Sequence, residues 1–167
     1  AVYYLARMLA AGEDPIFICR RMVILASEDI GLANPNALLL ANNCFQAVHQ
    51  IGMPEGRIIM SQTAIYLAGS PKSNASYLAI EKANALVQQT GDLPVPLHLR
   101  NAPTALMKEI GYGKGYQYAH DFEPGHSDME CLPDEIKGTT LYQPSNNASE
   151  AKIRESLSLI WKEKYGY

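Results

Sequence analysis

The chain has 167 residues, of which 47% are hydrophobic and 19% charged. This balance is typical of a globular protein and excludes an intrinsically disordered one. The net charge of −3 gives no global argument for nucleic-acid binding, although a local basic face stays compatible with it. No apolar run approaches the roughly 18 residues that a membrane span needs, so we expect no membrane contact.

Proline and glycine mark the expected helix ends in the first part of the chain. Asp14-Pro15 and Asn34-Pro35 each place an N-cap side chain before a proline, and Met53-Pro54 marks a third helix start. Glycine adopts the left-handed C-cap conformation without steric penalty, so we expect helices to end at Gly12, Gly31, Gly52, Gly69 and Gly91. The opening AVYYLARMLAAGED lacks Met and is already in helical register, which indicates a piece of a longer protein.

Apolar residues recur every three or four positions in residues 16–30, 37–51 and 75–87, as in amphipathic helices. Residues 57–68 are apolar nearly all round, which predicts a central helix or one covered by a second subunit. Cys19 and Cys44 lie on the apolar stripes, and no C-x-x-C pair occurs. We therefore expect buried free thiols rather than a disulfide or a structural zinc site.

From Asp92 to Ser145 the chain is rich in proline, glycine and tyrosine, and only Thr104–Ile110 has a helical pattern. Its aromatic residues indicate packing rather than disorder. Asn147–Tyr165 again shows helical spacing. The sequence thus predicts an all-α fold, a bundle of about five to seven helices with a long irregular segment before the last one.

Residues 111–116, GYGKGY, carry the pattern most suggestive of chemistry. A phosphate-binding P-loop needs G-x-x-x-x-G-K-[ST] between a strand and a helix, and this stretch has neither the hydroxyl residue nor a preceding strand. We interpret it as a helix end at Gly111 followed by a tight turn that lets Tyr112 and Tyr116 pack. An anion site at Lys114 stays open as an alternative.

A metal site could combine His98, His120 and His126 with Asp121, although no H-x-x-x-H spacing holds two ligands on one helix face. An enzyme that depends on a metal or an anion, built on residues 98–126, is therefore one alternative. A DNA-contacting module that uses a local basic patch is another. Its candidate contacts are Arg20, Arg21, Arg100, Lys108 and Lys114.

Four longer stretches resemble one known family. They are YYLARMLAAGEDPIFICRRMVILASEDIGLANPNAL (3–38), IGMPEGRI (51–58), SPKSNASYLAI (70–80) and LPVPLHLRNAPTALMKEIGYGKGYQYAHDF (93–122). These phrases resemble the C-terminal region of the RarA/MgsA family of AAA+ ATPases, which is related to clamp loaders. The resemblance covers nearly the whole chain and becomes looser after Cys131.

The resemblance implies a helical domain related to the clamp-loader collar, which holds subunits together as a homotetramer. It implies a role in DNA replication-fork maintenance and recombination, with DNA and replication proteins as partners of the full-length protein, in the cytoplasm at the nucleoid. The ATPase motifs of the family, with ATP and Mg²⁺, belong to an N-terminal AAA+ module that is absent from this chain. No catalytic, cofactor-binding or metal-binding residue is therefore carried over to any position here.

The resulting hypothesis is one C-terminal oligomerisation domain that is not an enzyme by itself. We expect a helical bundle at 1–91, an irregular wrapping segment at 92–145 and a C-terminal helix at 146–167. The apolar character of residues 57–68 and the C-terminal tryptophan supply the candidate subunit contacts. These are Ile58, Ile59, Tyr66, Leu67 and Trp161.

Overall fold

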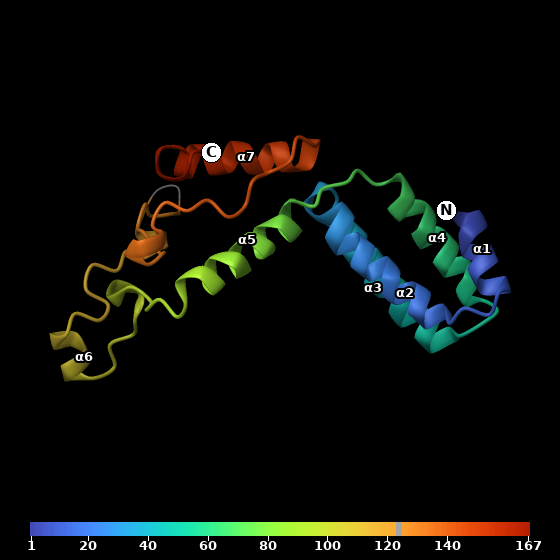
Figure 1. The fold of residues 1–167 in the computed structure, drawn as a ribbon, viewed down its shortest axis with the longest axis horizontal. Coiled ribbons are helices and arrows are strands. Elements are labelled where there is room, and N and C mark those ends of the chain that lie inside the picture. The colour runs from blue at the N-terminus through green and yellow to red at the C-terminus, as the bar shows by residue number, and fades with distance from the viewer. Residues whose placement is uncertain (123–124) are drawn as a thin grey trace. The chain divides into compact units, whose positions relative to one another are not determined.

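The structure, a computed structural model, describes residues 1–122 and 125–167. Within these residues every regular element is helical and no strand forms (Figure 1). The seven α-helices of the described residues confirm the predicted all-α fold. No helix in this part of the chain is both long and apolar enough to cross a membrane.

The chain forms two compact units. Unit 1 consists of Ala1–Glu81 and Tyr142–Ile153, and unit 2 consists of Lys82–Leu141 and Arg154–Tyr167. Along the sequence, the chain therefore passes from unit 1 to unit 2, back to unit 1 and then to unit 2 again.

Two helices contribute residues to both units. These are α5 (Ala75–Thr90) and α7 (Ala148–Tyr165). The sequence-based division of one domain into 1–91, 92–145 and 146–167 stays a prediction.

Unit 1 begins with α1 (Val2–Ala10) and α2 (Pro15–Leu25). The carboxylate of Asp14 accepts hydrogen bonds from the N–H groups of Ile16 and Phe17, at 3.0 and 3.1 Å. These N–H groups have no partner inside the helix, so the side chain satisfies donors that would otherwise need water. The predicted N-cap at Asp14 is confirmed.

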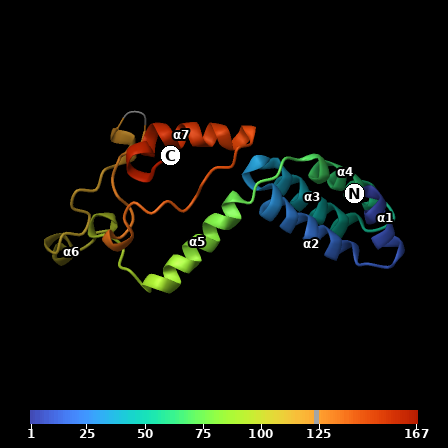
Figure 2. The ribbon, with the colours of Figure 1, turned by 45° about the horizontal axis from the view of Figure 1, so that its top comes forward.

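Helix α2 continues into a π-helical turn, Ala26–Ile30, and a 3₁₀ turn, Gly31–Ala33. Helices α3 (Asn36–Ile51) and α4 (Gly56–Gly69) follow. Helices α2, α3 and α4 lie side by side in both views (Figures 1 and 2), and α1 packs against α4.

The predicted N-cap at Asn34 is wrong. The Asn34 amide donates instead to the Tyr66 hydroxyl at 3.0 Å and to the Ser70 hydroxyl at 3.1 Å, so it joins the start of α3 to the end of α4. Helix α4 ends at Gly69 as expected, but the left-handed cap conformation predicted there is wrong, because Gly69 is the last helical residue and Ser70 beyond it is extended. The other expected helix-ending glycines have positive φ: Gly12, Gly31, Gly52 and Gly91.

Unit 1 has two clusters of buried apolar side chains. The first lies among α1, α2, α3 and α4 and consists of Leu5, Ile18, Cys19, Cys44, Val48, Met60 and Ala64. The second lies around the π-helical turn and consists of Ala26, Ile30, Ala37, Ala41 and Leu67. These clusters give unit 1 an apolar core of its own.

The returning segment of unit 1 is fixed by a buried carboxylate. Glu150, in the first turn of α7, has no accessible surface. Its partners include the side chains of Asn147, Tyr142 and Ser73. Burial acts to raise the pKa of Glu150, but the hydrogen bonds that it accepts outweigh burial and lower the pKa.

Unit 2 is mostly irregular. Its middle contains α6 (Ala105–Glu109), where Thr104 caps the helix by accepting from the N–H of Met107 at 3.3 Å. Gly111 follows the helix at φ 92°, so the predicted short helix is confirmed. The remaining helical pieces between Lys82 and Leu141, besides the end of α5, are three-residue 3₁₀ turns.

Unit 2 differs from unit 1 in burial. Every residue of unit 2 whose exposure the structure describes is half-buried or exposed, and both buried apolar clusters lie in unit 1. Unit 2 is therefore held by polar contacts and partly covered side chains rather than by a core of its own.

Candidate functional site

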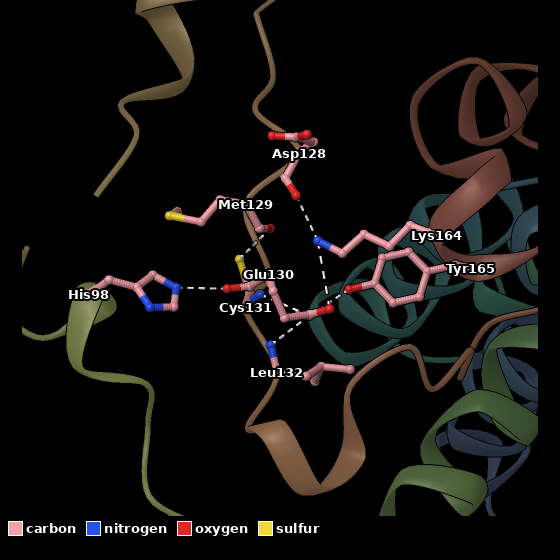
Figure 3. A network of polar contacts seen from close by, with 8 residues as sticks. All are labelled: His98, Asp128, Met129, Glu130, Cys131, Leu132, Lys164 and Tyr165. Atoms are coloured by element: carbon pink, nitrogen blue, oxygen red, sulfur yellow. Dashed lines mark hydrogen bonds and ion pairs between the residues drawn. The ribbon is translucent and has the colours of Figure 1, made fainter. Parts of the chain in front are cut away.

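A polar network in unit 2 joins three segments around one carboxylate (Figure 3). Glu130 Oε1 accepts from the N–H groups of Cys131 and Leu132, both at 3.0 Å, and from the Tyr165 hydroxyl at 2.7 Å. The Glu130 carbonyl accepts from His98 Nε2 at 2.7 Å. We call these residues, together with Asp128 and Lys164, the Glu130 network.

Lys164 closes the Glu130 network at the end of α7. Its ammonium lies 3.6 Å from Glu130 Oε2 and donates to the Asp128 carbonyl at 2.7 Å. Burial acts to raise the pKa of Glu130, but the hydrogen bond from Leu132, that from Tyr165 and the Lys164 charge together lower it. Burial and the bond to Glu130 raise the pKa of Tyr165, which keeps its hydroxyl protonated as a donor. The network thus acts as a structural clamp.

A groove of about 500 Å³ lies beside the Glu130 network, with prolines on its walls. Two side chains of the groove, His98 and Arg100, could bind an anion, but both already form hydrogen bonds within the protein. His98 Nε2 bonds the Glu130 carbonyl. The Arg100 guanidinium donates to the Val95 carbonyl at 2.7 Å and to the Tyr112 hydroxyl at 3.1 Å. The exposed carboxylates Asp134 and Glu135 also line the groove. Its charge therefore disfavours an anionic substrate.

The GYGKGY stretch is a turn that is closed on itself. Gly111, Gly113 and Gly115 have φ of 92°, 70° and 82°, which only glycine adopts readily. The Gly113 N–H donates to the Leu97 carbonyl at 2.9 Å, and the Lys114 N–H donates to the Gly111 carbonyl at 3.2 Å. Because these N–H groups bond within the protein, they do not form a phosphate cradle.

Of the two tyrosines expected to pack against this turn, one does so. The Arg100 guanidinium lies over the Tyr112 ring, 5.2 Å from the centre of that ring. Tyr116 is exposed, as is the ammonium-bearing Lys114. The expectation that Tyr116 packs in this chain is therefore wrong.

The three histidines of the metal hypothesis have separate neighbours. His98 belongs to the Glu130 network, His120 lies 5.0 Å from the ring of Tyr118, and His126 lies 6.3 Å from the ring of Trp161. Within residues 1–122 and 125–167, no group of three His, Cys, Asp or Glu side chains is placed to hold a metal ion. These contacts give the metal hypothesis no support.

The candidate DNA contacts fall into two groups. Arg20 and Arg21 are exposed on α2 of unit 1, and the Arg20 guanidinium lies 5.8 Å from the ring of Phe17. Arg100, Lys108 and Lys114 belong to unit 2, where Lys108 and Lys114 are exposed. Of the three candidates in unit 2, Lys108 and Lys114 are thus the exposed ones.

The candidate subunit contacts differ in what they offer a partner. Ile58 is 63% exposed and lines an apolar groove of about 510 Å³ between α1 and α4. Leu67 is only 2% exposed and belongs to the core of its own protomer, so it has no surface left for a second subunit. Ile59 packs against the first core cluster, and Tyr66 bonds Asn34. Trp161 is half-buried between His126 and Tyr165.

A further set of exposed apolar side chains lies in unit 2, although more of the exposed large apolar side chains lie in unit 1. Those of unit 2 come from the end of α5, from α6 and from the irregular chain around it, and the sequence analysis did not assign them to an interface. We call them the unit 2 apolar surface: Val87, Val95, Leu97, Leu106, Ile110, Tyr116, Tyr118 and Phe122. The signal in the sequence was the density of large apolar residues in a stretch that lacks a helical or strand period.

Comparisons with known proteins show the family of the chain. The sequence model of a family described as MgsA AAA+ ATPase C terminal matches residues 1–161. Replication-associated recombination protein A of Coxiella burnetii is 46% identical over 163 residues, which are 97% of this chain and 37% of that protein. The protein of the same name from Escherichia coli K12 is 44% identical over 161 residues, 96% of this chain and 36% of that protein.

A eukaryotic relative is similar over most of the chain as well. ATPase WRNIP1 of Dictyostelium discoideum is 42% identical over 154 residues, 92% of this chain and 18% of that protein. The chain spans 37% or less of the length of each of these three curated relatives. The chain belongs to the MgsA family of AAA+ ATPases, whose C-terminal region it matches.

Proposed function

We propose that this chain is the oligomerisation domain of a longer AAA+ ATPase that acts in DNA replication-fork maintenance and recombination. In this proposal the domain is not an enzyme by itself and assembles as a homotetramer. The longer protein binds ATP and Mg²⁺ in an N-terminal module, has DNA and replication proteins as partners, and works in the cytoplasm at the nucleoid. The family description and the names of the relatives support the link to ATPases, replication and recombination.

The unit 2 apolar surface carries the oligomerisation proposal. Its eight large apolar side chains are exposed to solvent, and covering them with a second subunit would favour assembly. Covering apolar surface stabilises an assembly by about 25 cal/mol per Å². Aromatic side chains are enriched in interfaces, and Tyr116, Tyr118 and Phe122 are three of the eight.

The energetics of unit 2 point the same way. Ordering one residue costs about 1–2 kcal/mol of backbone entropy, and a typical internal hydrogen bond returns only about 0.5–1.5 kcal/mol. Polar contacts such as the Glu130 network therefore cannot alone offset the cost of ordering unit 2. Apolar burial has to supply the remainder, and unit 2 does not complete that burial itself.

Analytical ultracentrifugation of this chain over a range of concentrations tests the proposal. We expect a species larger than a monomer at tens of micromolar, with a mass that identifies the subunit number. A strict monomer at that concentration would remove the oligomerisation function.

A DNA-contacting role is a second candidate, favoured by one observation. Lys108 and Lys114 are exposed in the same unit as the exposed rings of Tyr116 and Tyr118. Lysines beside aromatic rings suit single-stranded nucleic acid, because cations contact phosphates and rings stack on bases. Fluorescence anisotropy with a labelled single-stranded oligonucleotide tests this role. Binding that weakens with salt and is lost in a K108E/K114E variant supports it, and no binding at low salt excludes it for this chain.

A further inference from the structure

The groove beside the Glu130 network is formed by two segments of unit 2. Its walls come from residues 94–100 and 130–135, which both belong to that unit. The 2.7 Å hydrogen bond from His98 Nε2 to the Glu130 carbonyl joins one wall to the other (Figure 3). Each wall also includes residues of a 3₁₀ turn that backbone hydrogen bonds close. Hydrogen bonds within the protein therefore hold the two walls in place.

The walls of the groove offer apolar contact more than hydrogen-bond donors. Pro94, Pro96 and Pro133 lack a backbone N–H and contribute apolar rings. Val95 and Leu97 also line the groove, and they are 56% and 45% exposed, so an occupant that covers them gains from apolar burial. The volume of about 500 Å³ lies within the roughly 300–1,000 Å³ that is typical of ligand-binding clefts.

The charge that the groove leaves free is negative. One guanidinium and three carboxylates line it, and the carboxylates are those of Glu130, Asp134 and Glu135. The guanidinium of Arg100 already bonds a carbonyl and a hydroxyl of the protein, and Glu130 pairs with Lys164. Asp134 and Glu135 are exposed, and their carboxylates form no ion pair or hydrogen bond with the part of the chain that the structure describes. These two carboxylates are thus available to a cation.

We propose that this groove binds an extended segment of a partner protein in which a lysine or arginine lies beside an apolar residue. The apolar stem of such a cation covers proline rings of the walls while its charged head reaches Asp134 and Glu135. The neighbouring apolar residue covers Val95 and Leu97, so that burial adds to the attraction between charges.

The two properties of the groove disfavour other classes of ligand. A nucleic acid would bring phosphates toward free carboxylates, which repel them. A small polycation matches the charge but leaves the apolar walls in water. The proposal goes beyond the oligomerisation function and does not depend on it.

Fluorescence anisotropy with labelled peptides tests the binding. The probes are peptides of equal length in which leucine, valine or proline flanks a central lysine on either side. Matched peptides carry serine or glutamate in place of that lysine. We expect lysine peptides to bind, with an affinity that falls as the salt concentration rises, because salt screens exposed charges. The serine peptides should bind on the order of tenfold more weakly, and the glutamate peptides more weakly still.

Variants of the groove test the same contact from the side of the protein. D134K/E135K should bind the lysine peptides on the order of tenfold or more weakly, because like charges then meet. D134N/E135Q removes the charges but keeps the size of both side chains, so it should weaken binding by a smaller factor. The control is E109K/D121K, which changes the net charge equally at two exposed residues of unit 2 outside the groove. This control should bind like the wild type, and circular dichroism verifies that each variant is folded.

Several results of these titrations would overturn the inference. Lysine peptides that bind no better than serine peptides, or not at all, would remove the cation site. Unchanged binding by the folded groove variants would place the contact elsewhere. An equal loss in E109K/D121K would assign the effect to net charge alone. Spermidine that competes as well as an unlabelled lysine peptide would identify a small polycation as the ligand, to which the apolar walls contribute nothing.

The state of assembly separates this inference from the oligomerisation function. We expect D134K/E135K to sediment like the wild type. Loss of assembly in that variant alone would show that a second copy of the chain fills the groove, which overturns the partner segment and leaves oligomerisation intact. A wild-type chain that is monomeric and binds the lysine peptides would remove the oligomerisation function and support the groove.

Discussion

The hydroxyl of Tyr142 donates a 2.8 Å hydrogen bond to Glu150, a carboxylate with no accessible surface. Tyr142 is the first residue of the segment with which the chain returns to unit 1, and Glu150 lies in the first turn of α7. Ser73, before α5, also bonds Glu150. One buried acid therefore links the start of α7 to the segment that precedes α5, both within unit 1.

We predict that Glu150→Gln destabilises unit 1 by about 1–3 kcal/mol at neutral pH, because an amide leaves at least one buried donor without an acceptor. The pKa of Glu150 in the folded protein is lowered relative to the unfolded chain, where it is about 4.3. Its ionised form therefore stabilises the fold above that value, and the stabilisation is lost as pH falls through the folded-state pKa. Urea denaturation at neutral and acid pH measures the effect.

The stability difference between wild type and Glu150→Gln should shrink as pH falls below about 4. Glu155→Gln is the matched control, since Glu155 is exposed on the same helix and its removal should leave the urea midpoint unchanged. A difference that stays constant down to acid pH would show that the ionised carboxylate is not what the donors require.

Asp14→Ala is expected to destabilise the protein by about 1 kcal/mol, because the N–H groups of Ile16 and Phe17 lose their acceptor. Asp14→Asn keeps a capping oxygen and should cost much less. Both values can be measured by urea denaturation followed by circular dichroism. Equal losses for the two variants would contradict the capping role.

Much of the helical layout is predictable from the sequence, because it depends on neighbouring residues. Asp14 caps α2 and Thr104 caps α6 through atoms within three positions, and glycines end α1 and α3 through their own backbone freedom. Asn34 has the same local sequence signal as Asp14 but makes a different contact. The fold brings Tyr66 and Ser70 to its amide, and no local pattern encodes that approach.

Burial of individual side chains was less predictable. An all-round apolar pattern in residues 57–68 predicted a central helix or one covered by a second subunit, but it could not tell the buried Leu67 from the exposed Ile58. No sequence pattern singles out Glu150, because donors to its carboxylate come from distant segments. Unit 2 carries many apolar residues, and sequence alone does not reveal that they leave it without a core.

Thiol reactivity should separate the three cysteines. Cys19 and Cys44 are free and buried with their sulfur atoms 3.9 Å apart, whereas Cys131 is exposed. The hydrogen bond with Cys44, and burial, raise the pKa of Cys19, which further reduces its reactivity. We predict that a thiol reagent labels Cys131 rapidly and the other two only after denaturation.

Mass spectrometry of the labelled chain identifies the modified residue, and Cys131→Ser should abolish the rapid phase. Labelling of Cys19 or Cys44 as fast as Cys131 would mean that the core between α2 and α3 opens readily in the native state.

Gly31→Ala should be the most costly of the glycine substitutions in unit 1, at about 3 kcal/mol. Gly31 has φ 49° and ψ −133°, a conformation that is essentially restricted to glycine, and a Cβ there would lie 2.7 Å from the Ser73 carbonyl oxygen. Ser73 cannot move away freely, because its N–H donates to the Asp29 carbonyl at 2.7 Å. Gly12→Ala is the control, since Gly12 also has positive φ but its Cβ would meet no atom within 4 Å, and strain alone should cost about 1–2 kcal/mol. Urea denaturation of both variants measures the difference in stability. An equal loss at the two positions would show that Ser73 moves away from the new Cβ without loss of stability. The close approach of Gly31 to Ser73 would then not help to hold unit 1 together.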